Sequence, residues 1–213
     1  MNYKEAYLIA VVGGDGTIYQ KKKKQNLLYI SDKCEEYHQV LRNFFKEIFS
    51  YDATTRFVKQ RNTFYTIVRN KDIVNYFLQY HPAGISKTLT CRVPRAIFEA
   101  DDTTKMYHLA GWINSESYPK LQRSKGHQYP RVLIESVSRN LIRDLYDLSL
   151  DIGIPSTKPH LCKRNYKNRL ERYGVEWNGK KCCKLLPFMF HNSKEGRLQK
   201  YASLQGDQIE GLT

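Results

Sequence analysis

The sequence repeats the same order of structural signals at a shift of 104 residues. Each half begins with an apolar helix pattern, followed by two strand patterns and then an amphipathic helix pattern. A repeat of this kind indicates that one structural unit is used twice. We therefore expect two similar halves. The aligned apolar positions are Ile30 with Ile134, Leu41 with Leu145, Phe44 with Leu148 and Ile48 with Ile152.

Hydrophobic periodicity predicts the element order αββαββα in each half, and hence an α+β fold. In the first half we expect helices over 6–14, 34–50 and 71–80, with strands over 17–20, 26–31, 54–61 and 63–69. In the second half we expect helices over 107–115 and 138–153, with strands over 120–123 and 131–135 around a turn at 124–128. The pattern of 175–188 matches that of 67–80. The predicted units are an N-terminal half (1–82), a connector (83–104), a C-terminal half (105–204) and a polar tail (205–213).

The chain is strongly basic. Lys and Arg number 35 against 21 Asp and Glu, which gives a formal net charge of +14 and a pI near 9.5. A surplus of this size predicts a polyanionic partner, either nucleic acid or an acidic membrane surface. No basic amphipathic helix is evident, so nucleic acid is the better prediction.

The five cysteines show no disulfide pattern, which predicts reduced thiols. No C-x-x-C spacing supports a zinc site built from His160, Cys162, Cys182 and Cys183. The sequence contains no secretion signal or membrane-spanning pattern. We expect a reducing intracellular compartment, which is an archaeal or bacterial cytoplasm, or an organelle.

The two apolar helices that open the halves share a pattern of small residues. Ala10 and Gly14 lie four positions apart on one predicted face, and Gly111 with Ser115 occupy the equivalent places. Small residues at this spacing let two helix backbones approach closely. If the helices pack through these faces, the acids that follow Gly14 and Ser115 lie side by side.

Those acids are Asp15 and Glu116, and their placement is costly without a cation. Both stand at the negative end of a helix dipole, and two neighbouring carboxylates repel each other. A divalent metal relieves both problems, and oxygen ligands favour Mg²⁺. The alternative is two core helices whose terminal acids simply face solvent. The matching placement in both halves favours a metal site.

The two helix segments, LIAVVGGDG (8–16) and LAGWINSES (109–117), resemble the paired motifs of the LAGLIDADG homing endonucleases. The resemblance is to the single-chain form with two pseudo-symmetric halves. The segment 91–112, with its Val-Pro pair, is similar to the connector that leads into the family's second motif. Residues 3–200 are covered by the resemblance.

The resemblance implies that Asp15 and Glu116 bind the catalytic metals, with Gly14 and Ser115 as further metal ligands. It also implies two antiparallel β-saddles, packed through the motif helices, that straddle the major groove of DNA. Asp32 and Ser136 match the family's polar positions that organise water. Lys120 or Lys33 matches its basic residue near the scissile phosphate, and the catalytic set is Asp15, Glu116, Lys120 and Asp32.

The motifs depart from the family pattern at three positions. Gly13 and Asn114 replace an acid that is not essential. Ser117 replaces the final glycine of the second motif, and serine adopts the left-handed backbone conformation less readily than glycine. We expect this change to slow the enzyme, since both essential acids are retained.

Basic and polar side chains cluster where such saddles would contact DNA. Strand alternation points Tyr19, Lys21, Tyr29 and Ser31 to one face, opposite Ile18, Leu28 and Ile30. Side chains of these types contact phosphates or base edges, and the sequence does not assign which. The predicted DNA-binding residues are Tyr19, Lys21, Lys22, Lys23, Lys24, Tyr29, Ser31, Arg56, Gln60, Arg61, Arg69, Gln122, Arg123, Lys125, His127, Gln128, Arg131, Lys163, Arg164 and Lys167.

Three functions fit these features. The leading hypothesis is a monomeric, intron-encoded endonuclease that cuts a specific double-stranded DNA site. We expect Mg²⁺ as its cofactor, Mn²⁺ to substitute for Mg²⁺, and Ca²⁺ to bind without supporting cleavage. The alternatives are a maturase that binds intron RNA and a DNA-binding regulator that does not cut.

Overall fold

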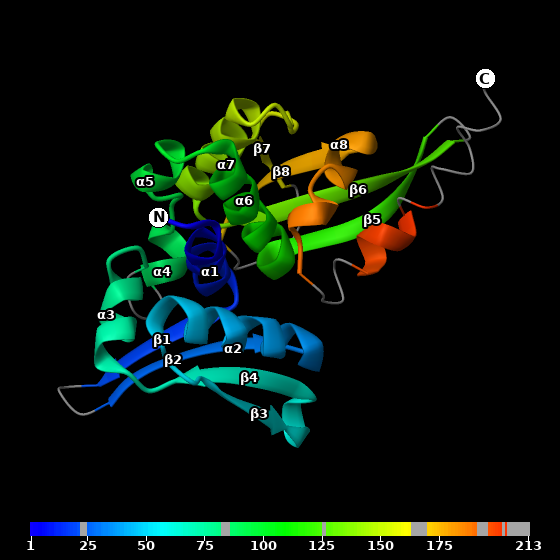
Figure 1. The fold of residues 1–213 in the computed structure, drawn as a ribbon. Coiled ribbons are helices and arrows are strands. Elements are labelled where there is room, and N and C mark those ends of the chain that lie inside the picture. The colour runs from blue at the N-terminus through cyan, green and yellow to red at the C-terminus, as the bar shows by residue number, and fades with distance from the viewer. Residues whose placement is uncertain are drawn as a thin grey trace.

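The computed structural model describes residues 1–21, 25–81, 86–124, 127–162, 170–190, 196–201 and 203. It has two halves, each built on a four-stranded antiparallel sheet (Figure 1). The strand orders, β1-β2-β4-β3 and β5-β6-β8-β7, are the same topology used twice. The repeat predicted from the sequence is therefore confirmed. No helix in the described part of the chain is long and apolar enough to span a membrane.

The elements keep the predicted order. The first half comprises α1 (Tyr3–Gly14), β1 (Gly16–Lys21), β2 (Gln25–Asp32), α2 (Glu35–Phe49), β3 (Thr54–Val58), a 3₁₀ turn (Lys59–Arg61), β4 (Thr63–Val68) and α3 (Lys71–Leu78). The short helices α4 (Ser86–Thr90) and α5 (Arg95–Phe98) follow. The second half comprises α6 (Asp102–Glu116), β5 (Ser117–Ser124), β6 (His127–Ser136), α7 (Arg139–Asp151), β7 (His160–Leu161), β8 (Tyr173–Asn178), α8 (Lys180–Cys183) and a 3₁₀ turn (Leu186–Phe188).

Several predicted boundaries were wrong. The strand expected over 54–61 ends at Val58, because the chain turns through a 3₁₀ helix to Asn62, whose φ is 46°. The helix expected from 107 begins at Asp102, where the Asp101 carboxylate accepts a hydrogen bond from the Thr104 backbone. In the second half β5 continues to Ser124 and β6 begins at His127, so most of the predicted turn at 124–128 is strand.

One face of each sheet is covered by an amphipathic helix. Ile18, Leu28 and Ile30 are buried beneath α2, whereas Tyr19 on the other face is 44% exposed. The alternation predicted for these strands is therefore confirmed, and it leaves the opposite face of each sheet open.

Helices α1 and α6 lie side by side between the two sheets (Figure 1). A Cβ added to Gly111 would lie 2.8 Å from both the Ala10 Cβ and the Tyr7 carbonyl oxygen. A Cβ added to Gly14 would lie 2.6 Å from the Ser115 Cβ. Both distances are too short for real contacts, so the small residues are needed for the close approach that the sequence predicted.

Two buried histidines fasten other elements to α1. The His108 Nδ1–H of α6 donates to the Ala6 carbonyl at 2.8 Å, and the Trp112 indole N–H donates to His108 Nε2 at 3.1 Å. His81, just after α3, donates from Nε2 to the Ile9 carbonyl at 2.6 Å. Because His108 both donates and accepts, its ring is held in the neutral form.

The stability of the fold is expected to fall in mild acid because of His108. Burial, reinforced by His81 and opposed by the bond to Ala6, lowers the pKa of His108 from 6.5 to about 3. The unfolded chain takes up this proton below pH ~6.5 and the folded chain does not, so stability is lost as the pH falls from there. The loss attributable to His108 between pH 7 and pH 4 is on the order of 3 kcal/mol.

Urea unfolding at a series of pH values measures this loss directly. The variant His108→Asn places an amide N–H near the position of His108 Nδ1, so it keeps a donor for the Ala6 carbonyl. Because asparagine does not titrate, the free energy of unfolding of the variant should depend less steeply on pH. Equal pH slopes for the wild type and the variant would show that His108 is not the group responsible.

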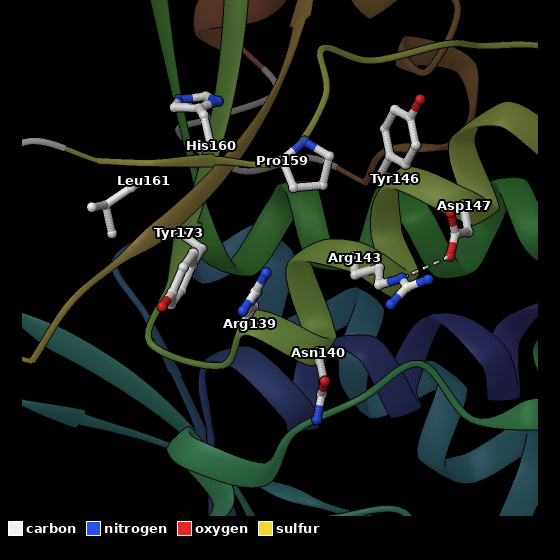
Figure 2. Close-up of a pocket in the computed structure, with 9 residues that line it drawn as sticks. All are labelled: Arg139, Asn140, Arg143, Tyr146, Asp147, Pro159, His160, Leu161 and Tyr173. Atoms are coloured by element: carbon white, nitrogen blue, oxygen red, sulfur yellow. Dashed lines mark ion pairs between the residues drawn. The ribbon is translucent and has the colours of Figure 1, made fainter.

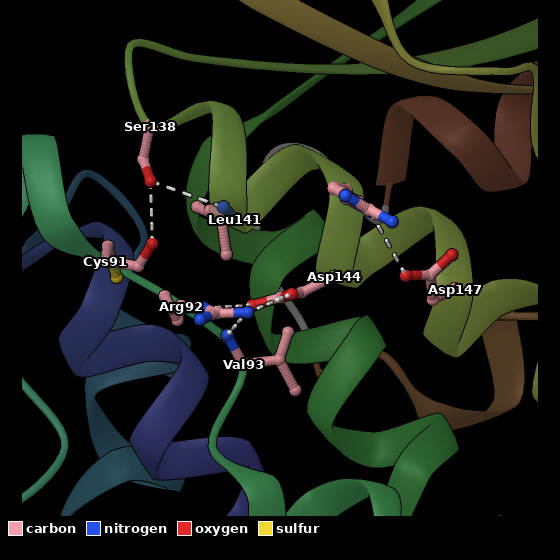
Figure 3. Close-up of polar contacts among 8 residues, drawn as sticks. Cys91, Arg92, Val93, Ser138, Leu141, Asp144 and Asp147 are labelled. Atoms are coloured by element: carbon pink, nitrogen blue, oxygen red, sulfur yellow. Dashed lines mark hydrogen bonds and ion pairs between the residues drawn. The ribbon is translucent and has the colours of Figure 1, made fainter.

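Hydrogen bonds hold the connector between the halves against α7 (Figure 3). Arg92 donates two hydrogen bonds to the Asp144 carboxylate, at 3.1 and 3.0 Å, and the Val93 backbone donates a third at 3.1 Å. The Ser138 hydroxyl donates to the Cys91 carbonyl at 2.7 Å, and its oxygen also accepts from the Leu141 backbone. Asp144 is buried, so these bonds offset the cost of burying its charge.

Candidate active site and nucleic-acid interface

The two motif acids stand at the ends of the paired helices. Asp15 is the residue that caps α1, and Glu116 is the last residue of α6. A Cβ at Gly14 would lie 2.3 Å from Ser115 Oγ and 3.0 Å from Glu116 Cγ. The end of one helix therefore touches the end of the other, which brings the two acids to the same place in the molecule.

Each acid also adjoins the strand that ends in a predicted water-organising residue. The Ser31 backbone donates to the Asp15 carbonyl at 3.5 Å, one residue before Asp32. In the second half, Glu116 and Ser136 line one small cavity of about 120 Å³, which Gly14 also lines. The structure thus brings Asp15, Glu116, Asp32 and Ser136 to one region around the ends of α1 and α6.

Asp32 and Ser136 make equivalent local contacts. The Cys34 backbone N–H donates to Asp32 Oδ1 at 2.8 Å, and the Ser138 N–H donates to Ser136 Oγ at 3.1 Å. Each bond fixes the turn between a strand and the following helix. One Asp32 carboxylate oxygen and the Ser136 hydroxyl hydrogen are not used by these bonds.

A buried pair of tyrosines supports the first half of the site. The Tyr7 and Tyr37 hydroxyl groups lie 3.0 Å apart, and both side chains are fully buried. Burial raises the pKa of both residues well above its usual value, and the charges of Asp15 and Asp32 raise it further. Both tyrosines therefore stay neutral, and the pair adds no charge beside the acids.

The donor set at the helix ends suits a hard divalent cation. Asp15 and Glu116 offer carboxylate oxygens, and the Glu116 side chain is exposed. Ser115 Oγ is buried and donates to the Gly111 carbonyl at 3.0 Å, so Ser115, like Gly14, would contribute a backbone carbonyl. Among the described residues, no group of three or more His, Cys, Asp or Glu side chains is placed to hold a metal.

Ser117 does not strain the second motif, contrary to our expectation. Its φ is −81° and its ψ 161°, an extended conformation that any residue adopts. The equivalent Gly16 is needed for space, since a Cβ there would lie 2.5 Å from the Val12 carbonyl oxygen. The structure therefore gives no basis for the expectation that a left-handed backbone at Ser117 slows the enzyme.

The open face of the first sheet gathers predicted DNA-binding residues around a groove. This groove, about 360 Å³ in volume, lies over β2, β3 and β4 and includes neither Tyr19 nor Ser31 in its lining. Tyr65, which the sequence analysis missed, packs on Tyr29 with ring centroids 5.7 Å apart and accepts a bond from Arg61 at 3.2 Å. The predicted residues that line the groove are Tyr29, Arg56, Gln60, Arg61 and Arg69.

The second sheet presents a different arrangement. Lys120, Gln122 and Arg131 share its open face, as the register of β5 and β6 requires. Arg131 forms an ion pair with Glu176 and donates to Gln122 at 3.3 Å. The same register places Arg123 and Gln128 opposite each other on the other face of the hairpin.

The other predicted residues lie in turns or outside the described part of the structure. Lys33 is exposed in the turn that follows Asp32. Lys21 and His127 belong to strands, but their side chains lie outside the described part of the structure. The following predicted residues also lie outside it: Lys22, Lys23, Lys24, Lys125, Lys163, Arg164 and Lys167.

Two residues that the sequence analysis missed line the cavity beside Glu116. Glu135 and Arg172 form an ion pair at 3.9 Å and both border this cavity. Strand alternation around the buried Ile134 could have placed Glu135 on the open face. Arg172 precedes β8 in a segment without a periodic pattern, so nothing in the sequence signalled it.

Comparison with protein-family models and with curated proteins gives no match. Solved structures do match over nearly the whole chain. I-DmoI in complex with DNA and Ca is 17% identical, with coverage of 90% of this chain and 91% of that one, at a TM-score of 0.61. The LAGLIDADG meganuclease I-AabMI bound to uncleaved DNA is 14% identical, with coverage of 99% and 92%, at a TM-score of 0.60.

The I-LtrWI LAGLIDADG homing endonuclease bound to target DNA also matches, at 12% identity and a TM-score of 0.56. The match covers 99% of this chain and 91% of the I-LtrWI chain. The similarity therefore spans both sheets and both motif helices. The chain has the fold of the LAGLIDADG homing endonucleases, in the single-chain form with two pseudo-symmetric halves.

Proposed function

We propose that this protein is an endonuclease that cuts a specific site in double-stranded DNA and depends on a divalent metal. The observation that carries the proposal is the meeting of Asp15 and Glu116 at the ends of two helices packed through Gly14 and Ser115. Two neighbouring acids at helix C-termini are unfavourable without a cation. The placement of one such acid at the matching position of each half therefore indicates a cation.

In this proposal Asp15 and Glu116 hold the metal, with the Gly14 and Ser115 carbonyls as further ligands. When bound, the metal supplies charge stabilisation for the attacking and leaving oxygens of phosphodiester hydrolysis. Asp32 and Ser136 orient water through the oxygen and the hydroxyl hydrogen that their turns leave unused. Lys120, on the open face of the second sheet, neutralises the scissile phosphate.

The open faces of the two sheets would lie in the major groove. The groove lined by Tyr29, Arg56 and Arg61 and the row of Lys120, Gln122 and Arg131 supply the donors and acceptors for base readout. I-AabMI and I-LtrWI, which share this fold, have been solved bound to DNA, which supports DNA as the ligand. I-DmoI has been solved with DNA and Mn and with DNA and Ca, which supports a divalent metal.

The direct test is to cleave a library of long randomised duplexes with Mg²⁺, beside parallel reactions with Mn²⁺ and Ca²⁺. We expect discrete cuts with Mg²⁺ and Mn²⁺, and binding without cutting in Ca²⁺. The sequence of the cut duplexes also gives the recognition site. Binding without cutting in every metal would instead indicate a regulator, and binding only to intron RNA would indicate a maturase.

Binding to the target duplex is expected to weaken steeply with salt. Each phosphate contact releases a counterion, which gives a slope of about −0.9 in log affinity against log salt concentration. For about six phosphate contacts, affinity should fall on the order of 1,000-fold between 50 and 200 mM salt. Fluorescence anisotropy at several salt concentrations measures the slope. Affinity that is nearly constant over this range would contradict a basic DNA-binding saddle.

A further inference from the structure

A hollow of about 760 Å³ lies between α7 and the edge strand β7 (Figure 2). It is lined by Arg139 and Arg143 of α7, His160 of β7 and Tyr173 of β8, with Pro159 forming part of its wall. The proposed catalytic roles use none of these residues. The hollow is bordered by two guanidinium groups and an imidazole against one carboxylate, that of Asp147, so its chemistry suits an anion.

The position of Arg139 is unfavourable for the helix that carries it. Arg139 is the first residue of α7, where the helix dipole is positive and repels a cation, and the first turn of α7 contains no acid. At the shift of 104 residues, Arg139 corresponds to Glu35 and Arg143 to Gln39. Glu35 opens α2 with the charge that the dipole favours. The placement of Arg139 therefore does not serve helix stability, and the equivalent helix of the first half carries neither arginine.

The hollow holds one arginine in place and leaves the other accessible. The Arg139 guanidinium lies 5.7 Å from the centre of the Tyr173 ring, within the range of a cation–π contact. Arg143 faces Asp147 at 4.0 Å, and both side chains are largely exposed. An exposed pair at this distance contributes little, so Arg143 can turn to a stronger acceptor at small cost.

The hollow adjoins the cavity beside Glu116. Val137 and Arg172 line that cavity, whereas Arg139, two residues after Val137, and Tyr173, directly after Arg172, line the hollow. A nucleic-acid strand that placed a phosphate at Glu116 would present further phosphates about every 3.4 Å along the helix axis. Charge and proximity therefore favour a neighbouring phosphate of that strand as the anion for the hollow.

We propose that Arg139 and Arg143 bind a backbone phosphate of the DNA duplex, on the side of the cut that contacts the second half. Bidentate geometry and charge suit both guanidinium groups to a phosphate. This inference rests on the proposed function, because the ligand is the same duplex. The contact is sequence-independent and sets the register of one flank of the site, since Glu35 and Gln39 offer no equivalent contact on the other flank.

The test uses the double variant Arg139→Gln/Arg143→Gln, which keeps side-chain length and removes both charges. The matched control is Lys46→Gln/Arg95→Gln, which removes two exposed positive charges elsewhere in the chain. On the duplex that the wild type cuts, the first variant should bind on the order of 10- to 100-fold more weakly in Ca²⁺. The magnitude of its salt slope should be smaller by about 1, because one phosphate contact is lost, and the slope of the control should be unchanged. Circular dichroism and thermal unfolding establish that both variants are folded.

Phosphate-ethylation interference gives the position of the contact. In the wild type, one or two modified phosphates on a single flank should block binding, and this block should disappear in the double variant. Equal affinity, salt slope and interference in the wild type and the variant would overturn the proposal while wild-type cleavage still supported the nuclease. A loss of RNA binding with intact duplex binding would also overturn it, by showing a different ligand.

Discussion

Replacing Asp15 by Asn, or Glu116 by Gln, is expected to abolish cleavage while the variants still bind the target duplex. Each substitution preserves the shape of the side chain and removes one of the negative charges proposed to hold the metal. Losing the charge stabilisation that the metal supplies, at least 4 kcal/mol, lowers the rate by about 1,000-fold or more. Single-turnover cleavage with Mg²⁺ measures the loss, and gel mobility in Ca²⁺ measures binding.

The control for this pair is Glu99→Gln. Glu99 is an exposed carboxylate that follows α5 and pairs with Arg95 at 2.7 Å, outside the proposed site. The Glu99→Gln variant should cut the target duplex at the wild-type rate. Normal cutting by either Asp15→Asn or Glu116→Gln would show that the acids at the helix ends are not the metal ligands.

The variant Gly111→Val is expected to destabilise the protein by about 3 kcal/mol or more. Any Cβ at this position would lie 2.8 Å from the Tyr7 carbonyl oxygen, which is backbone and cannot move aside without displacing α1. The Ala10 Cβ, also at 2.8 Å, blocks the other direction. Urea unfolding followed by circular dichroism gives the change in free energy.

Gly196→Ala serves as the matched substitution, because a Cβ at Gly196 meets nothing within 4 Å and the residue is helical. Alanine has the higher helix propensity, so this variant should be as stable as the wild type or slightly more so. If Gly111→Val unfolded at the wild-type urea concentration, α1 and α6 would not be in the close contact described.

Sequence patterns predicted the parts of this fold that depend on local periodicity. The repeat at 104 residues, the burial of Ile18 and Ile30, and the small-residue faces of α1 and α6 all follow from residue type and spacing. The start of α6 was missed by five residues although Asp101 is a good helix cap, because the prediction followed the apolar run that begins at Tyr107.

The remaining features depend on contacts between distant segments. Arg131 pairs with Glu176 only because β6 and β8 are neighbours in a particular register. Arg92 finds Asp144 through the folding of the connector against α7. Ion-pair partners of this kind are not encoded by spacing along the chain, so the sequence alone could not identify the cavity residues Glu135 and Arg172 as a pair.

The α1–α6 contact also decides which half-proteins can be joined into a working molecule. Two pairs of small residues form the contact: Ala10 packs against Gly111, and Gly14 packs against Ser115. At the first pair the backbone of α1 also limits the space. A foreign half grafted onto this one must therefore present residues of the same size at those two pairs. Where that match holds, we expect the proposed recognition surfaces to be exchangeable as modules, without redesign of the proposed hydrolytic centre between them.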